Sequence, residues 1–247
     1  MADATRQAKP VGAATAKTRA RDPVASRGRI LAAAKAEFAR KGLAGARVDT
    51  IAERACINKR MIYHYFGSKN DLYLAVLEEA YGDIRLAERL LDLEHLEPVE
   101  AITKLVEFTW GYYIRNPEFL RLINTENLHR AAHLKRSKRI AEMHSPFVAL
   151  IERVLRRGAE RGLFRDDLDP NQVYISIAAL GYYYLNNRYT LSVIYGFDLG
   201  AKDALDRRRS VIVDIILSYL RKPVTDCANA RKTLKNSREN HLKSPTG

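Results

Sequence analysis

The chain has 247 residues, of which 47% are hydrophobic, and its two cysteines, Cys56 and Cys227, lie far apart. This composition suits a packed core and excludes a disulfide framework or a clustered thiolate metal site. No apolar run approaches the roughly 20 residues that cross a bilayer, and the N-terminus lacks the apolar core of a secretory signal. We therefore expect a cytoplasmic protein without a membrane segment.

The formal net charge of +13 is distributed unevenly along the chain. Residues 26–70 carry ten Lys or Arg and three Asp or Glu, whereas residues 71–222 carry 22 of each kind. This contrast indicates that residues 26–70, and not the neutral remainder, bind a polyanion. Residues 1–25 and 223–247 are basic and are expected to be disordered. These tails either add nonspecific phosphate contacts or are solvated tails without a role.

Between the tails the pattern predicts helix after helix and no strand pair, so the expected fold class is all-α. We expect a three-helix, helix-turn-helix domain over residues 26–72 and a larger helical bundle over residues 73–222. Helical spacing of apolar residues begins at Ile30, and further helices are expected over residues 48–55 and 59–65. The expected signals at their ends are a stop at Gly42, a cap at Asn58 and a Ser68–Asp71 capping box that begins a long fourth helix.

Prolines indicate where the later helices begin. The prolines expected in first helical turns are Pro98, Pro117 and Pro170, with Asn116 and Asp169 as caps. Ser145 and Pro146 are expected to start or kink a helix that ends at Gly162. The last two helices are expected over residues 170–195 and 202–220.

The short helices over residues 48–55 and 59–65 flank a tight turn and cannot bury a core alone, so the first helix must complete the domain. In a helix-turn-helix the second of these helices enters the major groove. Lys59 and Arg60 would then donate to guanine, and Met61 would contact a thymine methyl group. The alternative is a solvated helix with aromatic residues in the core.

A longer motif runs from Arg29 to Val76. Its residues are Ile30-Leu31-Ala32-Ala33-Ala34, Phe38, Gly42, Val48, Ile51-Ala52, Tyr63-His64-Tyr65-Phe66 and Ser68-Lys69-Asn70-Asp71-Leu72. In order and spacing this segment closely resembles the DNA-binding domain of the TetR family of bacterial transcriptional regulators. The resemblance implies a homodimer, binding to a near-palindromic operator in double-stranded DNA, a repressor-like mode and a helical ligand-binding domain.

The resemblance also implies that residues 59–65 form the recognition helix and that Tyr63, Tyr65 and Lys69 contact phosphates, which fixes register without reading sequence. The predicted DNA-binding residues are Arg47, Asn58, Lys59, Arg60, Met61, Tyr63, His64, Tyr65 and Lys69.

Two residues depart from the family pattern. Cys56 replaces the usual turn glycine, so a left-handed backbone there would be costly. Ala46 replaces a frequent threonine, and Arg47 is expected to take over its phosphate contact. A redox role for Cys56 has no partner thiol nearby to support it.

The last two helices match the family's usual dimer interface. Their apolar faces consist of Val173, Ile177, Leu180, Leu191, Val211, Ile215, Ile216 and Tyr219. These faces would build a four-helix bundle across a twofold axis. The alternative is that they close the core of the monomer.

Aromatic residues are dense in two segments of the C-terminal region, with amide and imidazole groups among them. Such a set is typical of a small-molecule site, and the alternative is aromatic core packing. The sequence suits an effector with aromatic or apolar bulk and one polar handle. The candidate pocket residues are Trp110, Tyr113, Asn127, His129, Tyr183 and Asn187.

Glu126, His129 and His133 are spaced so that one helix face could present three metal ligands. Arg130 follows His129, so the zinc-hydrolase pattern is absent. Surface or rim histidines are the preferred interpretation, and no metal or cofactor is expected.

Three functions compete. The preferred one is a repressor released from its operator by a small-molecule ligand. An enzyme built on a helical bundle lacks a nucleophile–base pair, a phosphate loop and a metal-hydrolase motif. The third is a DNA-binding protein without a ligand, such as an activator or architectural factor.

Overall fold

The computed structural model describes residues 22–222. The two predicted tails lie outside this range, except for residues 22–25. Pro23, Val24 and Ala25 are helical, so the predicted first tail extends too far by these three residues. Asp22 accepts a hydrogen bond from the Val24 amide and begins the helix.

Within residues 22–222 the chain forms nine α-helices and one short 3-10 helix, with no strand beyond an isolated bridge between Phe164 and Arg221. The elements are α1 (Pro23–Gly45), α2 (Val48–Arg54), α3 (Lys59–Phe66), α4 (Lys69–Arg89), α5 (Pro98–Arg115), α6 (Pro117–Leu128), η1 (Leu134–Arg136), α7 (Lys138–Glu160), α8 (Pro170–Tyr195) and α9 (Lys202–Leu220). The all-α prediction is confirmed. None of these described helices combines the length and hydropathy needed to span a bilayer.

Most of the predicted helix ends are observed. Gly42 has a φ of 65° and interrupts α1. Asn58 accepts from the Arg60 amide, Ser68 Oγ accepts from the Asp71 amide, and Asp169 accepts from the Asn171 amide. In each case a side-chain oxygen satisfies a backbone donor that the helix leaves unpaired.

One predicted cap is wrong, and one of the two alternatives for Pro146, a helix start, is excluded. Asn116 does not cap α6, because its side-chain amide donates to the Tyr112 carbonyl at the end of α5. Pro146 does not start a helix: α7 begins eight residues earlier, at Lys138, where Ser137 accepts from the Ile140 amide. A cap at the true first turn therefore outweighs the proline as a start signal.

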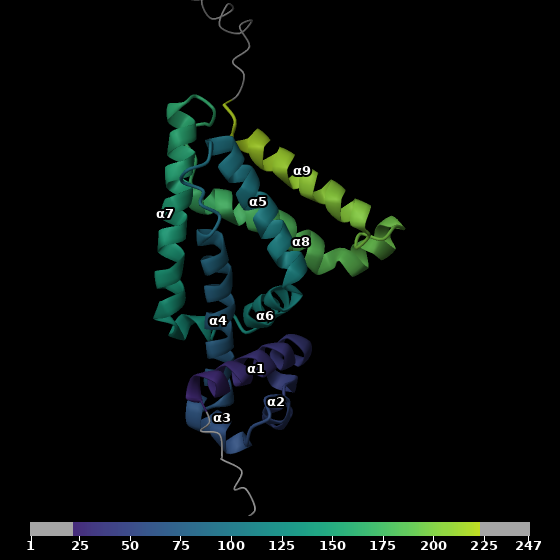
Figure 1. Ribbon diagram of the computed structural model, residues 1–247. Helices are drawn as coiled ribbons and strands as arrows, with labels where there is room; N and C mark the ends of the chain where they lie inside the picture. Colours follow the sequence, from purple (N-terminus) through teal and green to yellow (C-terminus); the bar gives the residue numbers. More distant parts are fainter. Residues whose placement is uncertain (1–21, 223–247) are drawn as a thin grey trace, which may run out of the picture.

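The helices form two regions that share α4 (Figure 1). Helices α1, α2 and α3 lie together at one end of the molecule, and α4 runs from this end into the larger bundle of α5 to α9. Helix α1 packs against both α4 and α6. The predicted domain boundary between residues 72 and 73 therefore falls inside a continuous helix, and α4 and α6 connect the two regions.

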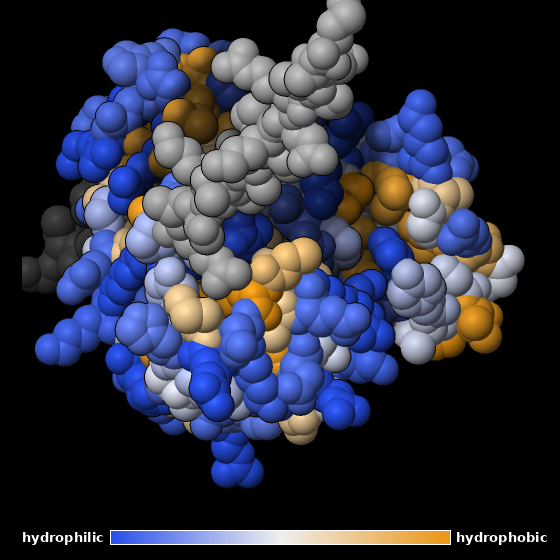
Figure 2. Space-filling model, turned by 60° about the horizontal axis from the view of Figure 1, so that its bottom comes forward, coloured by the Kyte–Doolittle hydropathy of each residue, from blue (hydrophilic) through white to orange (hydrophobic). Residues whose placement is uncertain are grey.

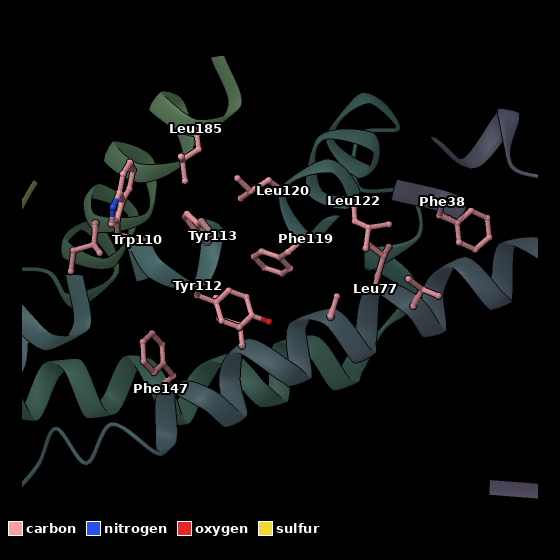
Figure 3. Close-up of a cluster of buried hydrophobic side chains, with 14 of the residues drawn as sticks. Phe38, Leu77, Trp110, Tyr112, Tyr113, Phe119, Leu120, Leu122, Phe147 and Leu185 are labelled. Atoms are coloured by element: carbon pink, nitrogen blue, oxygen red, sulfur yellow. The ribbon is translucent and has the colours of Figure 1, made fainter. Parts of the chain in front are cut away.

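One hydrophobic cluster extends through both regions. It includes Phe38 in α1, Leu77 in α4 and Leu122 in α6, and continues to the aromatic residues Trp110, Tyr112, Tyr113, Phe119 and Phe147 (Figure 3). Because protein interiors are close-packed, a shift of α6 must be accommodated by its neighbours. The shared core therefore provides physical continuity between the small end and the bundle.

The predicted dimer face divides into a buried set and an exposed set, with Leu180 and Leu191 half-buried between them. Val173, Ile177 and Ile216 are at most 1% exposed and belong to the core of the single chain. Val211, Ile215 and Tyr219 are exposed at helical spacing on α9. For the first set the monomer-core alternative is correct, and the second set leaves an apolar stripe on the surface.

Candidate functional site

The turn between α2 and α3 is held by backbone hydrogen bonds. The Ile57 amide donates to the Ala52 carbonyl, and the Cys56 amide donates to the Glu53 carbonyl. Cys56 has a φ of 52°, the left-handed conformation that glycine adopts more easily. This turn orients α3, and Cys56 keeps the left-handed conformation despite the cost that the sequence indicated.

Helix α3 buries one face and exposes the other. Ile62 is buried at the centre of the inward face, whereas Arg60, Tyr63 and His64 are exposed. Tyr63, at 42% exposed, is a large aromatic side chain directed to solvent among cations. An exposed aromatic residue beside basic residues is well suited to a partner surface.

The basic residues of this surface differ in their partners. Lys59 Nζ lies 2.8 Å from Asp49 Oδ1 on α2, and this pairing raises the pKa of Lys59. The exposed Arg47 and Arg60 have no side-chain hydrogen bond or ion pair to any of residues 22–222. Lys69 Nζ donates to the Ala44 carbonyl at 3.3 Å. Arg47 and Arg60 are therefore the cations available to a polyanion without breaking a contact.

The same end of the molecule carries a further cation that the sequence interpretation missed. Arg27 on α1 places its guanidinium over the Phe66 ring, 5.2 Å from the ring centre. Arg27 is remote from α3 in sequence, so no local pattern indicates this contact. Figure 2 turns this end toward the viewer, and its visible surface is largely hydrophilic.

A cavity of about 590 Å³ lies in the larger bundle between α5, α6, α7 and α8. Its walls are Tyr113, Ile123, Asn127, His144, Asn171, Tyr174, Ile175, Ala178, Ala179 and Tyr182. This volume is within the range of about 300–1,000 Å³ that is usual for small-molecule sites. The walls combine apolar side chains with a few neutral polar groups, the usual composition of such a site.

Comparison with known proteins agrees with this arrangement. Residues 30–76 match the model of bacterial regulatory proteins of the tetR family, and residues 98–216 match the tetracyclin repressor-like C-terminal domain. The chain is 40% identical over 210 residues to the HTH-type transcriptional repressor NicS of Pseudomonas putida, covering 84% of this chain and 99% of that protein. The chain belongs to the TetR family. It is a DNA-binding transcriptional regulator rather than an enzyme.

Two solved structures show the same fold. The transcriptional regulator SCO4942 of Streptomyces coelicolor superposes with a TM-score of 0.60 at 27% identity, covering 80% of this chain and 99% of that chain. FadR of Bacillus subtilis, solved in complex with stearoyl-CoA, has a TM-score of 0.59 at 18% identity, covering 78% and 98%. The second likeness concerns the fold alone.

In this TetR-family protein only two of the six predicted pocket residues line the cavity. Tyr113 and Asn127 lie on the wall of the cavity. Trp110 is buried in the core against Tyr184, with ring centres 5.7 Å apart. His129, Tyr183 and Asn187 are not on the cavity wall, and Asn187 donates to the carbonyl of Tyr183 on the same helix. The candidate pocket is therefore revised to the cavity wall.

The sequence did contain a signal for the missed wall. Tyr174, Ala178 and Tyr182 recur every fourth residue on α8 and form one face of that helix. The small alanine between the two tyrosines leaves room between the rings. Asn171, three residues before Tyr174, lies on the same face of α8. His144 lacks such a signal, because only the packing of α7 against α8 brings it to the cavity.

Glu126 and His133, two of the three residues weighed as metal ligands, contact each other instead. Helix α6 ends at Leu128, so His133 does not share a helix face with Glu126. Glu126 instead accepts from the His133 and Leu134 amides at 2.8 and 3.0 Å and pairs with His133 Nδ1 at 2.9 Å. Among residues 22–222 no three His, Cys, Asp or Glu side chains are grouped to hold a metal ion.

Proposed function

We propose that the protein is a homodimeric repressor that binds a near-palindromic operator and leaves it when a small molecule occupies the cavity. The observation that carries this proposal is the position of α6. It contributes Ile123 and Asn127 to the cavity and packs against α1 of the DNA-binding end. A ligand that changes the position of α6 therefore acts on the region that holds α3.

Contacts beyond α6 support the same coupling. Loop residues after α6 bind to the first half of α4: Arg136 pairs with Asp71 at 2.6 Å, and Ser137 Oγ donates to Glu78 at 2.6 Å. Asp71 belongs to the capping box at the start of α4, directly after α3. A ligand releases DNA only if it binds the DNA-incompetent arrangement more tightly.

The relatives support repression and a small-molecule effector. NicS is named a repressor, and FadR of similar fold was solved with stearoyl-CoA. The cavity argues against a DNA-binding protein without a ligand. An effector with aromatic or apolar bulk fits its walls. Because DNA is the partner, we place the protein in the cytoplasm.

We further propose that Arg47, Asn58, Lys59, Arg60, Met61, Tyr63, His64, Tyr65 and Lys69 form the DNA-binding surface. Arg60 is the base-reading cation, since it is exposed near the N-terminus of α3, the end that faces base edges in a helix-turn-helix. Asn58 acts mainly through its cap on Arg60, and Lys59 must exchange Asp49 for DNA.

The decisive experiment is footprinting and salt-dependent binding on DNA from the protein's own upstream region. We expect protection of a short near-palindrome, with Arg60→Ala costing about 1–3 kcal/mol of binding free energy, the usual worth of a good base contact. Arg89→Ala, an exposed arginine at the far end of α4, is the matched control and should bind as the wild type. Equal binding to all sequences, unaffected by Arg60→Ala, would overturn the proposal.

A further inference from the structure

A buried charged cluster lies directly behind one wall of the cavity. It consists of Arg85 and Glu88 on α4, which are 6% and 0% exposed, and Tyr174 on α8. The guanidinium of Arg85 lies 3.0 Å from Glu88 Oε2 and donates to the Tyr174 hydroxyl, which in turn donates to Glu88 Oε1 at 3.2 Å. Tyr174 is both a member of this cluster and a cavity-lining residue.

The positive charge of this cluster is incompletely satisfied. Arg85 Nε and Nη1 are buried without a hydrogen-bond partner within residues 22–222, as is Glu88 Oε2, which lies 3.0 Å from Arg85 Nε. The guanidinium instead packs on the rings of Phe147 and Tyr174, 4.4 and 5.1 Å from their centres; Phe147 is among the core residues of Figure 3. Burial raises the pKa of Glu88 to about 7, so near neutral pH its carboxylate compensates Arg85 only in part.

The positive charge of Arg85 affects the electrostatic potential inside the cavity. Partial burial and the nearby Arg85 charge both lower the pKa of His144, which lines the cavity with its ring centre 6.1 Å from that of the Tyr174 ring. No Asp, Glu, Lys or Arg is among the described residues of the cavity wall. A cation in the cavity would therefore find no counter-charge, whereas an anion would interact with a desolvated arginine at low local dielectric.

We propose that the cavity binds an organic anion, a carboxylate on an apolar body, with the carboxylate placed at the Tyr174 hydroxyl. This inference rests on the proposed function, because it names the chemical class of the effector for the same cavity. Tyr174 accepts from Arg85, and when Glu88 holds its proton the Tyr174 hydroxyl can turn its own proton from Glu88 to the ligand carboxylate. The neutral groups of Asn127, His144 and Asn171 supply further hydrogen bonds. The apolar body lies against Ile123, Ile175 and the alanines of α8.

The test compares acids with amides of the same shape on the purified full chain without DNA. The probes are benzoate, 2-naphthoate and octanoate, each paired with its primary amide and measured by calorimetry and thermal shift. We expect at least one carboxylate to bind about tenfold more tightly than its amide, the factor that one modest charged contact supplies. Amides that bind as tightly as the acids, or no binding by any carboxylate at millimolar concentration, would overturn the inference.

Two variants test whether the buried cluster causes the preference for carboxylates over amides. Tyr174→Phe keeps the ring and removes the hydroxyl, and the double variant Arg85→Met with Glu88→Gln removes both charges together. Each should reduce the carboxylate-to-amide ratio toward one. Tyr184→Phe is the matched control, since its hydroxyl donates to the Leu199 carbonyl away from the cavity. If the double variant does not fold, Tyr174→Phe decides alone, and an unchanged ratio there counts against the inference.

Measuring DNA binding with the same acids and amides distinguishes the anion preference of the cavity from ligand-driven release of DNA. Amides that bind the cavity and release DNA would uphold the ligand-responsive repressor and overturn the anion preference. Carboxylates that bind with the expected preference and leave the protein on DNA would uphold the anion site and overturn ligand-driven release.

Discussion

Cys56 is a single residue whose backbone conformation is costly for its side chain. Its φ of 52° lies in the left-handed region, which costs an L-residue other than glycine about 1–2 kcal/mol. The thiol is exposed and, among the described residues, unpaired. The residue therefore influences the DNA-binding end through the turn rather than through sulfur chemistry.

We predict that Cys56→Gly stabilises the protein. Relief of the left-handed strain exceeds the extra entropy that glycine brings to the unfolded chain, so the free energy of unfolding should rise by about 0.5–1 kcal/mol. Urea unfolding measures this change. Cys56→Ala removes the thiol but keeps the strain and should gain nothing; an equal gain in both variants would show that the thiol was responsible.

Glu88 makes stability depend on pH. Burial raises its pKa to about 7, above the value of about 4.3 in an unfolded chain, so the folded state holds the proton more tightly. The resulting stabilisation is complete below about pH 4 and is lost as the pH rises through about 7. One unit of pKa shift corresponds to about 1.4 kcal/mol, so the loss amounts to a few kcal/mol at most.

We predict that Glu88→Gln weakens this pH dependence. Urea unfolding at pH 5 and pH 8 should show a smaller difference in the variant than in the wild type. His144 titrates with the opposite sign in both proteins, so its contribution cancels in the comparison. Glu107→Gln, on an exposed residue of α5, should follow the wild type. Identical pH profiles for Glu88→Gln and the wild type would contradict the assignment.

At the scale of elements, the loop after α6 is held by one buried carboxylate. Glu126, 2% exposed, accepts from two backbone amides and pairs with the His133 ring. The Tyr73 ring of α4 packs edge-on against that ring, 5.0 Å between centres. Arg130 and Ala131 adopt positive φ values of 55° and 57° within this loop. The carboxylate thus holds a strained loop against α4.

We predict that Glu126→Gln loosens this loop. A neutral amide accepts from the His133 and Leu134 amides more weakly than the carboxylate does, since hydrogen bonds to a charged group contribute about 1.5–3 kcal/mol and neutral ones about 0.5–1.5 kcal/mol. The free energy of unfolding should therefore fall by about 1 kcal/mol. Hydrogen exchange should increase in residues 129–137 and stay unchanged in α8. Glu107→Gln again serves as the control. Unaltered exchange in the loop would refute the role assigned to Glu126.

At the scale of the whole molecule, the α8–α9 end exposes apolar surface that one chain does not cover. Exposed residues there are Val193, Ile194, Tyr195, Phe197, Val211, Ile215 and Tyr219. Exposed apolar patches of this kind mark interaction surfaces, and a twofold partner would bury the same patch on both chains. Two recognition helices spaced about 34–36 Å apart would then meet successive major grooves.

We predict that Ile215→Arg dissociates the proposed dimer. A charge buried at the centre of the interface lacks a partner, so sedimentation should show monomers and operator affinity should fall as the second half-site contact is lost. Leu90→Arg, at an exposed apolar residue on the far end of α4, should remain dimeric and bind DNA normally. A dimeric Ile215→Arg protein would place the interface elsewhere.

The sequence alone determined the helices and the DNA-binding module. Asn58, Ser68 and Asp169 bind backbone amides two or three residues away, so the information for these ends is local. The motif from Ile30 to Leu72 likewise places every residue of the helix-turn-helix within about forty positions. Local signals were misleading at Asn116 and Pro146, where a neighbouring helix end and an earlier cap prevailed.

Only the tertiary structure decided the cavity, the cluster behind it and the division of the predicted dimer face into buried and exposed residues. The wall of the cavity combines Tyr113, His144 and Tyr174 from three helices, and no spacing within one helix encodes how these helices pack. The same packing buried Ile216 and exposed Ile215, although both are apolar and adjacent on α9. Periodicity shows that a residue is apolar and on a helix face, but the neighbouring helices determine what that face contacts.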